Sequence, residues 1–144
     1  MPYNYKKSQF RPRRPVRSFR DLEVYQKALE GAVAVTKNIL PILKEVSYPL
    51  ADEMIKCCLD IPRMIAEAHS RRFDDQATGI SLLDEAMINS NKMIVYLEQI
   101  RDIYGDEVEK VLIEELIKKY SYNRTKIFRL QKAWKSWLEK EEKQ

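Results

Sequence analysis

His69, Cys57 and Cys58 are the side chains of this sequence best suited to acid–base, nucleophilic or metal chemistry. Glu67 and His69 lie two positions apart, which places them on different sides of a helix, so a concerted acid–base pair is not expected there. Lone histidines near helix ends are usually solvated or capping groups, and we interpret His69 in that way. Cys57 and Cys58 have no recognisable activating partner nearby, so we interpret them as small core or interface residues.

The sequence also lacks motifs that bind a metal ion or a phosphate group, and its two cysteines are not spaced to form a disulfide. The sequence holds no HExxH pair and no cysteine spacing suited to zinc, and its three glycines, Gly31, Gly79 and Gly105, stand too far apart for a phosphate loop. Adjacent cysteines, whose Cα atoms are only about 3.8 Å apart, cannot form an ordinary disulfide, and a reducing, cytoplasmic setting fits them best. The sequence therefore predicts a protein that is not an enzyme, with no catalytic residues, metal ligands or cofactor.

An acid-free interval near the C-terminus is the strongest chemical signal in the sequence. Between Glu115 and Glu139 there is no acidic residue, whereas seven basic and five aromatic residues occur there. On a helix with about 100° per residue, five of these cations fall within an arc of roughly 140°, and Tyr122 projects within the same arc, where its ring could stack on a base. The five cations are Lys118, Lys119, Lys126, Arg129 and Lys132. The pattern predicts a face that binds RNA or DNA; the alternatives are an ordinary solvated face or a docking face for an acidic protein.

The N-terminal arm, residues 1–17, is basic too. The first 20 residues contain seven basic residues and no acidic one, whereas the remaining 124 residues contain 19 bases and 22 acids. Three prolines and the lack of an apolar period predict that the arm is disordered when free. An arm of this kind either binds nucleic acid or is a solubilising extension. Its candidate binding residues are Arg11, Arg13, Arg14 and Arg17.

Amphipathic helices must position these side chains, and apolar residues recur at steps of three and four along most of the chain. Ser18 with Asp21 resembles a capping box at the start of the first helix, whose apolar stripe includes Leu29 and Val33. Pro41 should kink or end this helix. The four predicted helices cover about residues 19–46, 49–70, 75–104 and 106–140.

The connections between these helices are short, and no alternating strand pattern competes with them. Gly105 is suited to cap the third helix, and Asp106 with Glu109 to open the fourth. The sequence therefore predicts an all-α protein, an antiparallel up-and-down four-helix bundle over residues 18–140. No apolar run approaches the ~20 residues of a membrane-spanning helix, so no membrane partner is expected.

Two segments carry a family resemblance. The first, SFRDLEVYQKALEGAV at residues 18–33, has a phenylalanine and an aspartate–leucine pair followed by an aromatic residue and QKA; the second, at residues 50–68, contains DIPRMIAEA, which is close to SIPSNIAEG. Together they resemble the four-helix-bundle family that includes the 23S ribosomal RNA intervening-sequence proteins and the accessory variability determinant of diversity-generating retroelements. The matching residues are Phe19, Asp21, Leu22, Tyr25, Gln26, Lys27, Ala28, Ile61, Pro62, Ile65, Ala66 and Glu67, whereas Asp60, Arg63, Met64 and Ala68 depart.

The resemblance covers about residues 18–138 and implies a non-enzymatic homopentameric barrel of four-helix bundles that binds nucleic acid. It implies a reverse transcriptase as a further partner and a bend in the second helix at Pro62. Asp21, Ile65 and Glu67 are the other residues to which it gives a structural role. Three functions stay open: a retroelement accessory protein, a structural adaptor for an acidic protein, and an intervening-sequence protein of unknown role.

Self-association is also expected from the sequence itself. Ile88, Val95 and Ile113 widen the apolar faces of their helices beyond one core stripe. A widened apolar face needs a second partner to cover it, which agrees with an oligomer.

Overall fold

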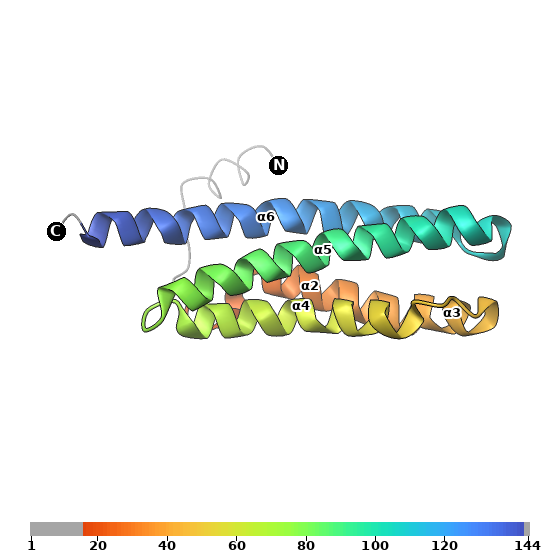
Figure 1. Ribbon diagram of the computed structural model, residues 1–144, viewed down its shortest axis with the longest axis horizontal. Helices are drawn as coiled ribbons and strands as arrows, with labels where there is room; N and C mark the ends of the chain where they lie inside the picture. Colours follow the sequence, from red (N-terminus) through yellow and green to blue (C-terminus); the bar gives the residue numbers. More distant parts are fainter. Residues whose placement is uncertain (1–15, 143–144) are drawn as a thin grey trace, which may run out of the picture.

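The computed structural model describes residues 16–142, which are helical over most of their length and contain no strand. Four helical units pack together: the unit formed by α2 and α3, and the helices α4, α5 and α6 (Figure 1). The bounds are Glu23–Ala34 for α2, Leu40–Val46 for α3, Ala51–Arg71 for α4, Gln76–Tyr104 for α5 and Lys110–Glu142 for α6. The predicted all-α class, with about four helices packed together, is confirmed. The predicted binding residues Arg11, Arg13 and Arg14 lie outside the described residues.

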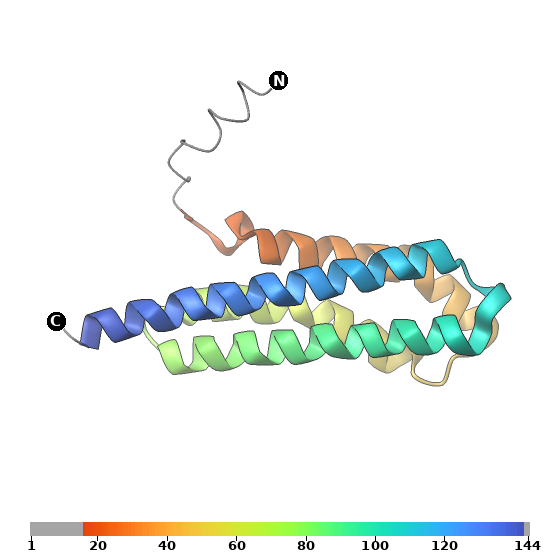
Figure 2. The same cartoon turned by 90° about the horizontal axis from the view of Figure 1, so that it is seen from above.

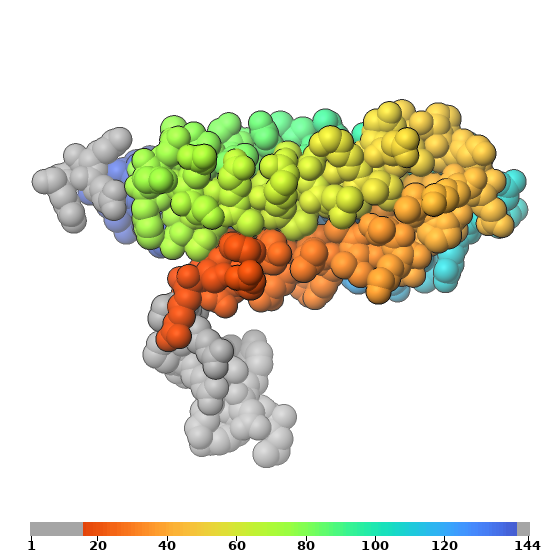
Figure 3. Space-filling model, turned by 90° about the horizontal axis from the view of Figure 1, so that it is seen from below, coloured from red at the N-terminus to blue at the C-terminus, as the bar shows by residue number. Residues whose placement is uncertain are grey.

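The four units enclose one core. Both α2 and α5 pack against α4 and against α6, and Figure 2 shows α6 lying between α2 and α5 when the molecule is seen from above. The opposite side, in Figure 3, is formed mainly by α2 and α4. The turn between α4 and α5 lies at one end of the molecule and the turn between α5 and α6 at the other. Within residues 16–142, no helix has both the length and the apolar character needed to cross a membrane.

The predicted capping box is present, but it caps a shorter element than expected. Ser18 Oγ accepts from the backbone N–H of Arg20 at 3.1 Å, and Asp21 Oδ2 accepts from the backbone N–H of Ser18 at 3.3 Å. The box begins only the 3-10 turn Phe19–Asp21 (η1), because the buried residue Leu22 is extended, with φ −73° and ψ 125°. The predicted start of the first helix near residue 19 is therefore a few residues early, and α2 begins at Glu23.

Pro41 changes the helix before its own position. The residues Val35–Ile39 (η2) form a π-helical turn, at whose end the N–H of Leu40 donates to the carbonyl of Val35, five residues earlier. Pro41 has no N–H for the carbonyl of Lys37, and the wider turn just before it lets the chain continue into α3. The α2–α3 unit therefore continues past the proline.

Helix α4 also continues through a proline. Pro62 is buried in the middle of α4, and helical structure extends on both sides of it from Ala51 to Arg71. The predicted start at residue 49 is two residues early, since Leu50 is the N-cap residue. Ile65, one turn after Pro62, is fully buried, whereas Glu67 is exposed and lies 3.9 Å from a guanidinium nitrogen of Arg63.

The ends of α5 agree with the predicted range 75–104. Asp75 Oδ1 accepts from the backbone N–H of Thr78 at 3.2 Å, and Gly105 follows Tyr104 with φ 46°, a value that favours glycine. The start of the last helix was predicted wrongly at residue 106. A 3-10 turn, Gly105–Glu107 (η3), and the extended, buried residue Val108 come first, so α6 begins only at Lys110.

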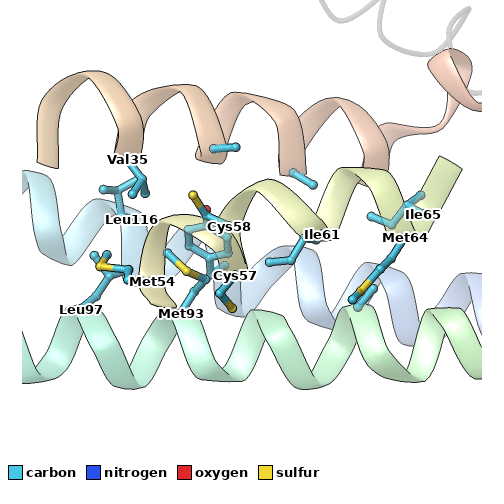
Figure 4. Close-up of a cluster of buried hydrophobic side chains, with 14 of the residues drawn as sticks. Val35, Met54, Cys57, Cys58, Ile61, Met64, Ile65, Met93, Leu97 and Leu116 are labelled. Carbon is cyan, nitrogen blue, oxygen red and sulfur yellow. The ribbon is translucent and has the colours of Figure 1, made fainter. Parts of the chain in front are cut away.

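The core is built from one buried stripe on each unit (Figure 4). Each fully buried aliphatic side chain contributes roughly 1.5–3 kcal/mol to folding relative to its exposed state. Ile113 belongs to this core with 0% exposure, so its prediction as part of a widened outer face is wrong, whereas Ile88 and Val95 are 55% and 48% exposed. The largest fully buried side chains are Ile39, Leu43, Met54, Ile61, Ile65, Leu83, Met93, Leu97, Ile100, Ile113, Leu116 and Ile127.

Candidate nucleic-acid interface

His69 is packed inside the bundle, which corrects the interpretation of a solvated or capping histidine. It is only 6% exposed, and Arg72 Nη1 lies 3.1 Å from its Nδ1 and donates to its backbone carbonyl oxygen at 2.6 Å. Its Nε2 has no hydrogen-bond partner among the described residues. Burial, and then the charge of Arg72, lower the pKa of His69, so the ring is held neutral. This environment suits a packing residue.

The two cysteines are buried thiols, as the sequence indicated. Cys57 Sγ donates to the carbonyl oxygen of Asn89 at 3.3 Å, and Cys58 Sγ donates to that of Ile55 at 3.2 Å. Burial raises the pKa of Cys57 to about 11 and that of Cys58 to about 12, so both thiols are protonated at neutral pH and are poor nucleophiles. In the described part of the chain, no three or more His, Cys, Asp and Glu residues are grouped so as to hold a metal ion.

Two buried amides set the rotation of α6. Asn123 Nδ2 donates to the carbonyl oxygen of Val24 on α2 at 3.0 Å. Gln131 Nε2 donates to the carbonyl oxygen of Ile80 at 3.0 Å and to Asp84 Oδ1 at 2.6 Å, both on α5. Because Asn123 and Gln131 point toward α2 and α5, the opposite side of α6 faces solvent.

That outer side holds all the binding residues predicted on the last helix. We call the set the α6 cationic face, and all of its members are exposed except Lys126, which is partly buried. None of its cations lies within 4.0 Å of a carboxylate among the described side chains. Elsewhere, for example, Lys56 and Asp60 form an ion pair at 2.8 Å. The members of the α6 cationic face are Lys118, Lys119, Tyr122, Lys126, Arg129 and Lys132.

Aromatic rings lie on or beside this face. Tyr122 is 55% exposed, and Lys126 Nζ lies 5.3 Å from the centroid of its ring. Phe128, 45% exposed, has Lys132 Nζ at 5.6 Å from its centroid. Both rings therefore lie next to a cation, but only Tyr122 belongs to the α6 cationic face, where a base can stack on the ring while a phosphate meets an ammonium group.

A hollow beside the cationic face brings in two residues that the sequence analysis missed. It has a volume of about 300 Å³ and lies between α2 and α6. Lys27 and Glu30 of α2 line it, and Lys27 Nζ lies 3.5 Å from Glu30 Oε2. No feature of the sequence pairs these residues with the last helix, because the contact depends on which side of α2 meets α6. We call it the α2–α6 hollow, lined by Lys27, Glu30, Lys118, Lys119 and Tyr122.

Of the predicted arm residues, Arg17 alone falls within the described residues. Its side chain is exposed, and its backbone N–H donates to Asp21 Oδ2 at 2.9 Å. Asp21 accepts two backbone N–H groups, those of Arg17 and Ser18, at the start of the bundle. Arg17 lies on a different element from the α6 cationic face, and its predicted role in binding stays a prediction.

Comparison of the chain with protein-family models, with curated proteins and with solved structures finds no match. The family resemblance described above therefore stays a prediction based on its two motifs.

Proposed function

We propose that this chain is a non-enzymatic protein that binds RNA or DNA through the α6 cationic face, without strong sequence preference. The observation that carries the proposal is that Lys118, Lys119, Lys126, Arg129 and Lys132 share one outer face and lack described carboxylate partners within 4.0 Å. Ordinary solvated faces mix charges of both signs, so a single-sign face in a body with more acids than bases favours a polyanionic partner.

The dimensions of the face suit a phosphate backbone. Lys118 and Lys132 are fourteen residues apart on one helix, which corresponds to about 21 Å along its axis. Duplex DNA carries one negative charge per ~1.7 Å, so a stretch of this length presents several phosphates. Each neutralised phosphate releases condensed counterions, and binding should therefore weaken steeply as salt is added.

Fluorescence anisotropy tests the proposal directly. The wild type is titrated into labelled structured RNA and labelled duplex DNA at several salt concentrations, beside a variant in which the five cations of the face are changed to glutamine. A matched variant with the same loss of charge changes five cations outside the face. Its substituted residues are Lys37, Lys44, Arg71, Lys110 and Lys140, which are exposed.

The proposal predicts binding whose log–log salt slope is about −0.9 per neutralised phosphate on duplex DNA and about −0.7 on single strands. The face variant should lose most of the affinity and most of the slope, whereas the matched variant should keep both. Equal losses in the two variants would mean that net charge, not this face, drives binding. If the wild type does not bind at low salt, the nucleic-acid function is rejected and the adaptor for an acidic protein takes its place.

The proposal extends to assembly. The short connections between the helices favour an antiparallel up-and-down bundle, and the adjacent cysteines favour a cytoplasmic setting. The family resemblance implies a homopentamer with a reverse transcriptase as a further partner. Exposed Ile88 and Val95 support self-association, because together with Asn91, Lys92 and Tyr96 they line a shallow apolar hollow of about 350 Å³ on α5. Light scattering at micromolar concentration tests this: a mass of 17.1 kDa, that of one chain, contradicts it.

A further inference from the structure

The α2–α6 hollow differs from the rest of the cationic face because it combines a cavity, cations, an aromatic ring and a carboxylate. Its volume of about 300 Å³ is that of the smaller ligand pockets of proteins, which start at about 300 Å³. Three lysines line it: Lys118 and Lys119 of α6 and Lys27 of α2. A flat phosphate-binding surface needs neither the cavity nor the carboxylate.

Tyr122 lines the hollow and is 55% exposed. Lys126 Nζ lies over the ring at 5.3 Å from the centroid, yet Lys126 does not line the hollow. A ligand in the hollow therefore meets Tyr122 but not Lys126. Stacking of a base on such a ring requires an unpaired base, since the faces of paired bases are covered by their neighbours in a duplex.

Glu30 gives the hollow a hydrogen-bond acceptor. Glu30 lines the hollow, its Oε2 lies 3.5 Å from Lys27 Nζ, and its side chain is 60% exposed. An ionised carboxylate only accepts hydrogen bonds, so it favours the exocyclic amino group of a base and disfavours a carbonyl oxygen at the same position. Cytosine presents an amino group where uracil presents a carbonyl oxygen.

We propose that the α2–α6 hollow binds one unpaired nucleobase of a single-stranded nucleic acid, stacked on Tyr122, with an exocyclic amino group donating to Glu30 and the flanking phosphates on Lys118 and Lys119. The inference rests on the proposed nucleic-acid function and adds a ligand class to it. It predicts that single-stranded cytosine tracts bind more tightly than uracil tracts.

The test measures anisotropy of fluorescein-labelled rC15 and rU15 with the full-length protein at pH 7.5 and low salt. The wild type should bind rC15 about ten times more tightly than rU15, which is the lower end of the effect of one hydrogen bond to a charged group. Glu30→Gln can donate as well as accept, so its ratio should fall to within twofold. Glu23→Gln, an exposed carboxylate on the same helix that does not line the hollow, should keep the wild-type ratio.

A second pair of variants tests the stacking of a base on Tyr122. Tyr122→Ala should weaken binding of both oligonucleotides about fivefold or more, since a base stacked on an aromatic ring contributes roughly 1–3 kcal/mol. Phe128→Ala removes another exposed ring with a neighbouring lysine and should change the affinity by less than twofold. Equal rC15:rU15 ratios in the wild type and Glu30→Gln, or equal losses in Tyr122→Ala and Phe128→Ala, overturn the inference while binding itself remains. Absence of binding to both oligonucleotides overturns the inference alone if duplex DNA or structured RNA still binds, and overturns the proposed function as well if neither does.

Discussion

The hydroxyl oxygen of Tyr120 on α6 lies 2.9 Å from the point that a Cβ atom would occupy on Gly31 of α2. The ring carbon Cζ of Tyr120 is 3.1 Å from the same point, and the residue is only 3% exposed. A rigid, buried ring cannot move aside as a flexible side chain would. Glycine at position 31 therefore allows α2 and α6, the two helices that line the candidate hollow for a base, to approach each other closely.

Gly31→Ala should destabilise the bundle. Overpacking of a well-packed core costs typically 1–3 kcal/mol, whereas alanine gains up to about 1 kcal/mol over glycine inside a helix. We expect the first effect to win, with a net loss of roughly 1 kcal/mol in the free energy of unfolding. Urea denaturation followed by circular dichroism measures it.

Tyr120→Phe provides the control for this contact. It removes a buried hydroxyl that has no hydrogen-bond partner among the described residues, so the single change should be neutral or stabilising. In the Tyr120→Phe background, Gly31→Ala should cost less than in the wild type, which a double-mutant cycle reports as a coupling energy. The same cost in both backgrounds would show that the two residues do not clash.

His69 should make stability depend on pH between 7.5 and 5.5. Burial and Arg72 lower the pKa of His69, only partly opposed by Asp21 of η1, from an ordinary value of 6.5. Below pH 6.5 the unfolded chain then binds the proton more readily than the folded chain, so stability rises with pH and is lost as the pH falls. For one proton the loss at pH 5.5 is at most about 1.4 kcal/mol. Urea titrations at the two pH values measure it.

The only histidine of the sequence makes the control simple. His69→Gln has no group that titrates in this window and should show nearly the same stability at both pH values. The aspartates with lowered pKa, Asp60, Asp75 and Asp102, start from an ordinary value of 3.8 and act at lower pH. A wild type whose stability is unchanged, or higher, at pH 5.5 would contradict the burial of a neutral His69.

Helical periodicity was enough to predict the α6 cationic face as a shared surface. Lys118 and Arg129 fall on one side of any regular helix, and that side faces outward because buried residues such as Ile127 occupy the other. The C-terminal end of α5 could also be predicted from the sequence, because the positive φ at Gly105 favours glycine.

Tertiary packing decided what the sequence left unpredicted. Leu29 and Val33, which the sequence analysis assigned to the apolar stripe of the first helix, are 44% and 45% exposed. The extended residue Leu22 and the π turn Val35–Ile39 change which side of α2 faces the core. The same rotation places Lys27 and Glu30 beside α6. His69 was misjudged for a similar reason, since its burial depends on neighbours from distant parts of the chain.

Cys57 and Cys58 should resist thiol reagents in the folded protein. Burial raises the pKa of Cys57 from 9.0 to about 11 and that of Cys58 to about 12. At pH 8 the thiolate fraction of Cys57 is therefore about 100-fold lower than that of an ordinary cysteine, and the thiolate is the reactive form. Reaction with Ellman's reagent should be slow in buffer and should release two thiols per chain in guanidinium chloride. Rapid reaction of either thiol in the folded protein would show an accessible cysteine.

Gln131 joins α6 to α5, and two substitutions there separate the loss of its hydrogen bonds from the addition of a charge. Gln131→Met keeps a side chain of similar length but leaves the carbonyl of Ile80 and the carboxylate of Asp84 without the buried donor, and it should cost roughly 1–3 kcal/mol. Gln131→Glu places a carboxylate where the amide nitrogen now lies 2.6 Å from Asp84 Oδ1. A buried, uncompensated charge costs on the order of 3–5 kcal/mol, so this variant should be the less stable of the two at pH 7.5.

The two Gln131 variants should also differ in their response to pH. In Gln131→Glu, repulsion by Asp84 and burial at a position that is 2% exposed raise the pKa of the introduced carboxyl group in the folded state, so the folded chain binds a proton more readily than the unfolded chain. Relative to Gln131→Met measured at the same pH, its stability should therefore increase as the pH falls from 7.5 to 5.5, while both share the loss caused by His69. Urea denaturation of the two variants at these pH values gives the difference. A difference that does not change with pH would show that the introduced carboxylate escapes to solvent, and that α6 can turn away from α5 at this position.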